Sequence, residues 1–298
     1  MTRWTNEQNL PAPLVAAIEN DDYESSGDIS VTRLIKPPRI VQLEKRYAKD
    51  IVQDVSGAVW MLLGKAVHYV LERAGVNHTT EHKIEEEHVV EVMGWKLSGR
   101  LDAHNLTTGV LSDYKITSVW SFLKGAKPEW EAQLNVNAWL LRRHGHDVKR
   151  LEITAILRDW SVTRTYEPDY PQAAALTVEI PIWDDAKAEA YVKDRMAKHQ
   201  AAVNVADDEL PSCTAEERWE KPTTWAVQKP GAAKAWRVKD TEIEAKDLAN
   251  QTKGMEVVQR PGESTRCRYY CSVLQFCQQG KWLVPPQDRT AKSAVGSA

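Results

Sequence analysis

Residues 57–160 alternate apolar and polar positions in a pattern that predicts a mixed α+β domain. The segment 57–75 repeats apolar side chains with a helical period and ends at a glycine, which predicts one long helix. Three runs rich in β-branched residues follow, separated by short glycine-bearing breaks, so we expect a meander of antiparallel strands. A second helix, which begins with a proline, and a further apolar strand complete the pattern. These later elements are expected at about 83–92, 95–104, 109–117, 128–145 and 151–160.

The same pattern divides the chain into four parts. An N-terminal arm and helical region precedes the αβββαβ core, which continues through one more helix. The composition then changes to shorter elements and a cluster of cysteines, which indicates a separate subdomain followed by a flexible tail. The four parts are expected at 1–56, 57–204, 205–280 and 281–298.

Composition and charge narrow the class of protein. Of 298 residues, 42% are hydrophobic and 27% are charged, which is typical of a globular chain rather than a disordered one. No apolar run reaches the ~18 residues that a membrane helix needs, and the N-terminus does not resemble a secretion signal. We therefore expect a soluble, cytoplasmic protein without a membrane partner. Because the formal net charge is −3, any nucleic-acid binding has to rest on local basic patches.

Three charged residues interrupt the predicted strands. Alternate side chains of a strand share a face, so Asp113 and Lys115 point the same way, and a hairpin register is able to bring Asp102 beside Asp113. Two converging carboxylates are costly to bury unless a divalent cation lies between them, and oxygen ligands favour Mg²⁺ or Mn²⁺. A neighbouring lysine is suited to binding a phosphate or positioning a water. Turn caps and a surface salt bridge are the alternative interpretation.

The flanking helices carry further polar residues at matching places. His68 lies one helical turn after Gly64, a residue that permits close approach, and a neutral imidazole is a sound ligand for Mn²⁺. On the second helix, Gln133 and Asn137 are also one turn apart. Together with the strand residues they form an ordered series: G-x-x-x-H, G-x-x-D, D-x-K and Gln.

This series resembles the PD-(D/E)XK nuclease superfamily, and specifically its RecB-like branch, which includes phage-encoded exonucleases and the iron–sulfur nucleases of CRISPR adaptation. The matching motifs are GKAVH (64–68), GRLD (99–102), DYK (113–115) and QLNVN (133–137). The resemblance implies an α/β, restriction-endonuclease-like αβββαβ core and a metal-dependent deoxyribonuclease. DNA ends or single strands are the implied substrate, hydrolysed exonucleolytically by a metal-activated water. Recombination or replication proteins of a phage or its host are the implied partners, and an oligomer is compatible with the sequence.

The resemblance also implies roles for individual residues. His68, Asp102 and Asp113 are the expected ligands of Mg²⁺ or Mn²⁺, joined by the backbone carbonyl of Tyr114. Lys115 is expected to act on the attacking water or on the scissile phosphate.

The last motif of the resemblance departs from the family's pattern. Gln133 is expected to place the lysine or the DNA, but the family usually continues Gln-x-x-x-Tyr, and this chain has Asn137 instead. The missing aromatic hydroxyl is expected to weaken DNA positioning without removing a metal ligand. An active enzyme remains the main hypothesis. The alternatives are a catalytically inactive, nuclease-derived module that binds DNA for recruitment, and a structural zinc protein.

All four cysteines lie late in the chain, at Cys213, Cys267, Cys271 and Cys277. A reducing cytosol disfavours disulfides, so this cluster indicates a metal site. Four thiolates suit either tetrahedral zinc or an iron–sulfur cluster, and their spacing does not distinguish the two. The resemblance favours a [4Fe–4S] cluster, with structural Zn²⁺ as the alternative, although the family's remote cysteine normally precedes the core. Either group is expected to stabilise a small subdomain.

Aromatic and basic residues near the D-x-K strand bear on DNA binding. The chain contains 12 tryptophans, and Trp120 and Trp130 flank the loop after that strand, where they are placed to stack on unpaired bases. Burial in the core is the alternative for both. Basic residues such as Lys124 and Lys127 are candidates for phosphate contacts.

Overall fold

A computed structural model of the chain describes residues 2–20, 26–75 and 81–285. These residues form two compact units. Unit 1 contains residues 1–38 and 52–204, and unit 2 contains residues 39–51 and 205–298. Residues 39–51 thus belong to unit 2 although they precede most of unit 1 in the sequence.

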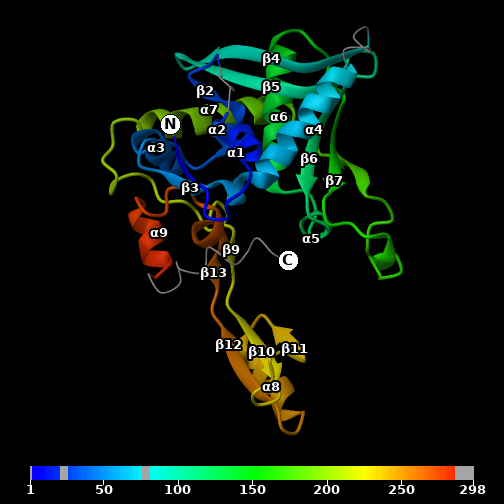
Figure 1. Cartoon of the computed structure of the whole chain (residues 1–298), viewed down its shortest axis with the longest axis vertical. Coiled ribbons are helices and arrows are strands. Elements are labelled where there is room, and N and C mark those ends of the chain that lie inside the picture. The colour runs from blue at the N-terminus through cyan, green and yellow to red at the C-terminus, as the bar shows by residue number, and fades with distance from the viewer. Residues whose placement is uncertain (1, 21–25, 76–80, 286–298) are drawn as a thin grey trace. The chain divides into compact units, whose positions relative to one another are not determined.

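Unit 1 is built on a six-stranded mixed sheet with the order β2-β5-β6-β7-β8, in which β4 also pairs with β5. Only the β2–β5 and β6–β7 pairs are parallel. Helix α6 packs along β4 to β7, and α4 packs against β4 and β6 (Figure 1). The strands are β2 (Ile29–Ser30), β4 (His82–Val92), β5 (Trp95–Asn105), β6 (Val110–Thr117), β7 (Arg150–Leu157) and β8 (Ala175–Ile180).

The helices of unit 1 complete the expected order of elements. They are α1 (Ala12–Glu19), α2 (Val31–Ile35), α4 (Val59–Gly75), α5 (Val119–Leu123), α6 (Pro128–Arg143) and α7 (Asp185–Ala201), and β1 (Arg3–Thr5) pairs with β3 (Val52–Asp54). The order α4-β4-β5-β6-α6-β7, with the short α5 inserted, confirms the α+β class and the αβββαβ sequence of elements. Among the described residues, no helix combines the length and apolar character needed to cross a membrane.

The core of unit 1 follows from the strand and helix periods. Along β7 every second residue is buried, which gives a row of apolar side chains from Leu151 to Leu157. The apolar face of α6 packs on this row and on β5 and β6. The buried cluster between them includes Leu101, Leu111, Leu134, Ala138, Leu141, Leu151 and Ile153. Because α6 is held by this core, the polar side chains at its edge have a defined position over the sheet.

Gly99 on β5 is expected to be intolerant of a side chain. A Cβ atom there would lie 2.6 Å from Asn137 Oδ1 and 2.6 Å from Leu140 Cδ1, both on α6, so Gly99→Ala should destabilise unit 1 by about 1–3 kcal/mol. Gly64 on α4 is the matched control, because a Cβ atom there would meet nothing within 4 Å. Gly64→Ala should therefore stabilise the helix by about 0.5–1 kcal/mol. Urea denaturation compares the two variants, and equal effects would contradict the packing at Gly99.

The free space around Gly64 was not expected from the sequence. The sequence suggested that Gly64 permits a close approach to α4, but no such approach occurs among the described residues. Gly99 in the GRLD motif is the glycine that a neighbouring helix approaches closely.

His88 on β4 lies in a group of imidazoles. Its side chain is 6% exposed, and the rings of His144 and His146 lie 5.0 and 5.6 Å from its ring, centroid to centroid. Burial lowers the pKa of His88 below its ordinary value, and the carboxylate of Glu86 opposes this effect. The neighbouring His144, His146 and Lys83 lower the pKa further.

We expect this lowered pKa to reduce stability in acid. The folded chain binds a proton at His88 less readily than the unfolded chain, whose histidines titrate near a pKa of about 6.5. As the pH falls below that value, the unfolded state gains protons first, so the free energy of unfolding decreases. A His88→Gln variant should lose less stability than the wild type between about pH 7.5 and about pH 5.5 in urea denaturation. Parallel declines would contradict this role of His88.

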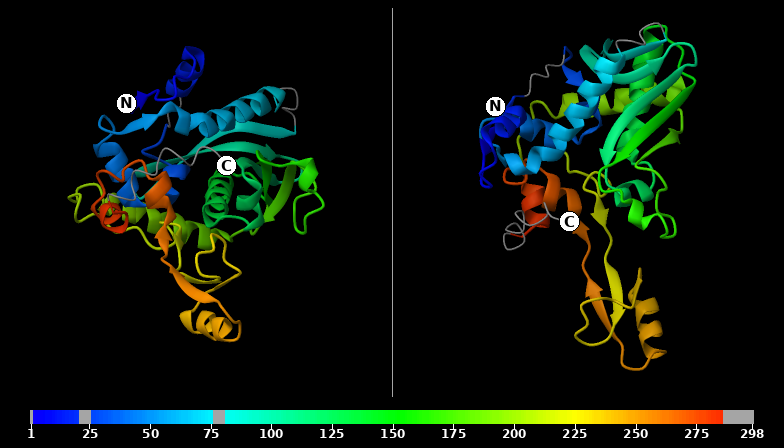
Figure 2. Two further views of the ribbon diagram at one scale, coloured as in Figure 1. Left: turned by 60° about the horizontal axis from the view of Figure 1, so that its bottom comes forward. Right: turned by 45° about the vertical axis from the view of Figure 1, so that its right-hand side comes forward.

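Unit 2 combines short helices with two small sheets. The three-stranded sheet has the order β11-β10-β12, with α8 beside it (Figure 2), and β9 pairs with β13. Its elements are α3 (Pro38–Arg46), β9 (Glu220–Lys221), β10 (Thr224–Gln228), β11 (Arg237–Lys239), α8 (Glu242–Asn250), β12 (Glu256–Arg260), β13 (Glu263–Ser264) and α9 (Gln278–Leu283). Of the tail expected at 281–298, residues 286–298 lie outside the described residues.

Two contacts explain why residues 39–51 belong to unit 2. The ring of Tyr47 stacks on Phe276, with 4.1 Å between the ring centroids. Arg39 is buried and donates hydrogen bonds to the carbonyl oxygens of Pro211 and Asp207, at 3.1 and 3.3 Å. A buried guanidinium needs several acceptors, and these carbonyls supply them.

Candidate active site

One edge of β5 is open where the GRLD motif lies. On that edge β2 pairs with residues 97–98 and β6 pairs with residues 103–105, whereas β4 occupies the other edge along its whole length. Residues 99–102 therefore have no strand partner on the open edge within the described part of the chain. The β5–β6 register, continued by one pair, sets Asp102 opposite Asp113. Opposed carboxylates repel each other, which agrees with the ladder stopping before this pair.

Asp102 reaches across the gap between the two strands. Its Oδ2 accepts a hydrogen bond from the backbone N–H of Tyr114 at 2.7 Å, in place of a ladder bond. Burial raises the pKa of Asp102 to about 7, and the negative charge of Asp113 adds to this rise. The nearby His68 opposes it. The carboxylate thus lies where negative charge is costly and a cation would relieve the cost.

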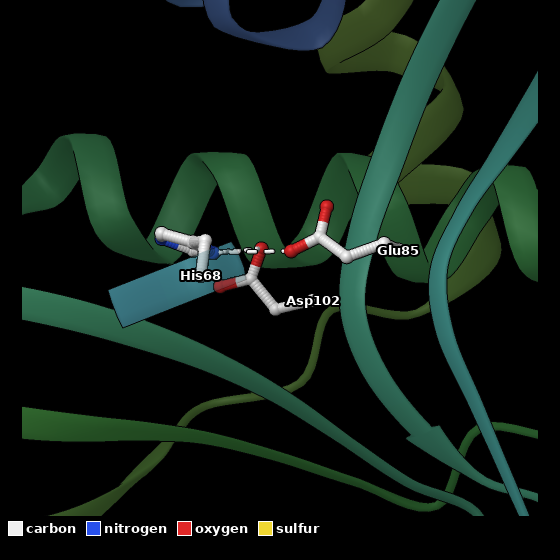
Figure 3. A group of neighbouring side chains, drawn as sticks. All are labelled: His68, Glu85 and Asp102. Carbon is white, nitrogen blue, oxygen red and sulfur yellow. Dashed lines mark hydrogen bonds and ion pairs between the residues drawn. The ribbon is translucent and has the colours of Figure 1, made fainter. Parts of the chain in front are cut away.

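Three side chains from three elements converge beside this gap (Figure 3). His68 comes from α4, Glu85 from β4 and Asp102 from β5. The Nδ1 atom of His68 lies 3.2 Å from Glu85 Oε1 and 3.6 Å from Asp102 Oδ1, and one ligand atom of each residue lies within 4.8 Å of the others. The hydrogen bond to Glu85 is the main cause that raises the pKa of His68. One imidazole and two carboxylates form a donor set that suits a divalent cation.

Glu85 is the site residue that sequence reasoning missed. The pairs on either side of it, Ile84 with Ala103 and Glu86 with Leu101, place Glu85 directly opposite Asp102. Its backbone has a φ of 51°, a conformation that costs a non-glycine residue about 1–3 kcal/mol and is found most often at functional sites. The only sequence signal was the run of three glutamates at 85–87. Choosing among them requires the strand register.

Lys115 and Asp113 form a second group on β6. The Nζ atom of Lys115 lies 2.7 Å from Asp113 Oδ2 and donates hydrogen bonds to Asp113 Oδ1 at 3.0 Å and to Gln133 Oε1 at 3.1 Å. Asp113 is 4% exposed, so the lysine supplies its counter-charge in a buried setting. Gln133, on α6, thereby fixes the direction of the ammonium group.

The structure divides the predicted ligand set. His68 and Asp102 lie together as expected, but the third member of their group is Glu85, and Asp113 is paired with Lys115 instead. Tyr114, expected to contribute its carbonyl, contacts Asp102 through its N–H.

The structure places Asn137 in the interior of unit 1. It is 3% exposed and its side-chain oxygen lies against Gly99, so it packs α6 on β5. A residue buried in this way does not present its side chain to a ligand at the surface. Asn137 therefore contributes to core packing in this chain.

The four cysteines come together in unit 2. All four are buried, and they line one pocket together with Arg218 and Arg266. Burial raises the pKa of Cys213 to about 12 and that of Cys267 to about 11, and the other thiols add to both shifts.

Backbone contacts hold the thiols in place although Cys213 is distant in sequence. Gln279, in α9, accepts a hydrogen bond from the N–H of Cys213 and donates one to its carbonyl, each at 2.9 Å. The sulfur of Cys277 accepts a hydrogen bond from the N–H of Gly280 at 3.3 Å.

Known proteins similar to this chain were found among solved structures. No protein-family model matches the chain, and no curated protein matches it. Among solved structures, the crystal structure of SSO0001 is similar, with a TM-score of 0.42 and 20% sequence identity. The match covers 62% of this chain and 83% of that chain.

Proposed function

We propose that the protein is a metal-dependent nuclease that hydrolyses phosphodiester bonds of DNA at ends or in single strands. The observation that carries the proposal is the pair of groups around the open edge of β5. A cation-binding set of His68, Glu85 and Asp102 lies on one side, and Lys115, held by Asp113 and Gln133, lies on the other. A metal site next to an oriented ammonium group is suited to phosphodiester hydrolysis, because both stabilise the negative charge that develops on the phosphate.

The residues present fit a divalent cation. Two carboxylates and one imidazole favour Mn²⁺, and Mg²⁺ is compatible with the oxygen ligands. The high pKa of Asp102, about 7, reflects buried negative charge that a cation would neutralise. When bound, the metal would supply polarisation of the phosphate and activation of water.

The protein's own residues supply the remaining chemistry. Lys115 is directed by two acceptors, so its positive charge is available where negative charge develops on the phosphate. Asp113, which is buried, forms an ion pair with this lysine. Glu85 and Asp102 both face the Nδ1 atom of His68, so the three residues direct their ligand atoms to one place.

We further propose that the four cysteines hold a [4Fe–4S] cluster. Four buried thiols that share one pocket suit a soft metal centre. The resemblance of the sequence to iron–sulfur nucleases favours the cluster, and structural Zn²⁺ is the alternative. Through the cluster, Cys213 would be joined to the segment 267–277 and to α9, which follows it.

A nuclease assay tests the proposed function. Protein purified without oxygen is incubated with end-labelled single-stranded and duplex DNA in Mn²⁺, Mg²⁺ or EDTA. We expect cleavage that requires the metal and that is lost in Glu85→Gln and Asp102→Asn variants. DNA binding without cleavage would favour the inactive recruitment module, and neither binding nor cleavage would favour a structural metalloprotein.

A further inference from the structure

Exposed tryptophans and cations lie beside the active site in unit 1. Trp60 at the start of α4 is 50% exposed, and Trp120 on α5 is 58% exposed. Exposed apolar side chains that gather in one place mark interaction sites. Three cations lie near the ends of neighbouring elements: Lys124 after α5, Lys127 before α6 and Arg158 after β7. We call this group the stacking surface, and it consists of Trp60, Trp120, Lys124, Lys127 and Arg158.

The ends of β6 and β7 place this surface next to Lys115. The two strands are parallel and stay paired up to Thr117 and Leu157, and the N–H of Arg158 then donates to the carbonyl of Thr117 at 2.9 Å. The N–H of Val119 donates to Asp159 Oδ1 at 2.7 Å, so the start of α5 is held at the end of β7. Lys115 precedes Thr117 by two residues, a distance of about 7 Å along a strand.

Arg158 covers the ring of Trp60. Its Cζ atom lies 4.4 Å from the ring centroid, which is cation–π geometry. Arg158 makes no ion pair with a carboxylate among the described residues, so its charge is available to a phosphate. A second arginine, Arg164, lies 5.6 Å from the ring of Trp120, but Glu167 neutralises it through two hydrogen bonds of 2.7 Å.

The cations of this surface are close enough to affect one another. Burial lowers the pKa of Lys127, and the charges of Arg158, Lys124 and Lys115 lower it further, although Glu129 opposes them. Positive groups that repel one another in this way attract a polyanion. Trp130 packs against the core cluster, and Lys127 Nζ lies 4.9 Å from its ring centroid, so Trp130 is not assigned a stacking role.

We propose that the stacking surface binds single-stranded DNA, with unpaired bases on Trp60 and Trp120 and phosphates on Lys124, Lys127 and Arg158. Aromatic faces and cations in alternation match the alternating bases and phosphates of a nucleic-acid strand. Only unpaired bases offer their faces, because those of a duplex are already stacked. The inference rests on the proposed nuclease function for the choice of DNA, since it places the strand beside Lys115.

A binding assay in EDTA separates stacking from charge. Fluorescence anisotropy compares a labelled oligothymidylate with an abasic oligonucleotide of equal length, which has the same phosphates and no bases. We expect the wild type to prefer the oligothymidylate by at least about tenfold. Trp60→Leu and Trp120→Leu should each weaken that binding by about tenfold and leave abasic binding unchanged. Trp282→Leu, which removes a tryptophan 83% exposed in unit 2, is the matched control and should have no effect.

A salt titration tests the phosphate contacts. For single strands, each phosphate contact contributes about 0.7 to the slope of log affinity against log salt, so Arg158→Gln should reduce the slope by about 0.7. Equal affinity for the abasic strand, tighter binding of duplex or of RNA, or a similar loss in Trp282→Leu would overturn the inference. So would a Trp60→Leu variant that changes the sedimentation of the protein but not its DNA affinity, because that surface would then bind a second copy.

The two proposals fail in different ways. Wild-type cleavage without a preference for bases would leave the nuclease proposal standing and remove the stacking surface. Base-dependent binding that requires both tryptophans, without cleavage in any metal, would leave the surface standing and remove the nuclease proposal.

Discussion

Replacing Lys115 with alanine is expected to lower metal-dependent DNA cleavage by about 10²–10³-fold while Mn²⁺ binding remains. The ammonium group is held 2.7 Å from Asp113 and 3.1 Å from Gln133, so it acts as a fixed positive charge and not as a mobile surface lysine. Lys115 is not one of the three residues that would bind the metal. Asp102→Asn should lose both cleavage and Mn²⁺ affinity, because it removes a ligand charge.

Two further variants keep this expectation testable. Loss of the cation leaves Asp113 buried without a partner, which is destabilising by itself. Lys115→Arg retains the ion pair but changes the shape of the donor, so it should fold normally and still cleave poorly. Lys149→Ala, which removes a lysine from an exposed pair with Asp147, is the matched control. Calorimetry with Mn²⁺ and the end-labelled DNA assay give the two readouts, and wild-type cleavage by Lys115→Ala would refute the role of the lysine.

Replacing Cys271 with serine is expected to release the metal centre and to lower the thermal stability of unit 2 substantially. The unit has small sheets and short helices, so a bound metal would contribute a large part of its folding free energy, about 10 kcal/mol for comparable structural sites. Serine offers a hard oxygen where the centre needs a soft thiolate. Elemental analysis and the visible spectrum report the metal, and differential scanning calorimetry reports the stability.

The neighbouring Ser272 provides the control for this experiment. Its Oγ donates a hydrogen bond to Glu44 at 3.0 Å, so Ser272→Ala should cost about 1 kcal/mol and retain the metal. Iron with a visible absorption band would support the iron–sulfur cluster. Stoichiometric zinc would instead show that the cysteines hold a structural zinc ion. Wild-type metal content and stability in Cys271→Ser would contradict a structural role for the cysteines.

The order of elements and most of the site residues could be predicted because they depend on local sequence. A period of 3.6 or 2 is a local property, and it located α4, the three following strands, α6 and β7. Asp113 and Lys115 are two residues apart on one strand, so strand geometry alone brings them together. The cysteine cluster was visible for a similar reason, since three of its members lie within one short segment.

The remaining features depend on which distant segments meet, and only the tertiary structure decided them. The β4–β5 register selects Glu85 from three adjacent glutamates, and the β5–β6 ladder ends so that Asp102 accepts a hydrogen bond from the N–H of Tyr114. The packing of α6 on β5 buries Asn137 and makes Gly99, not Gly64, the glycine at a close contact. Register and packing are set by the sum of many long-range contacts, so no local pattern carries them.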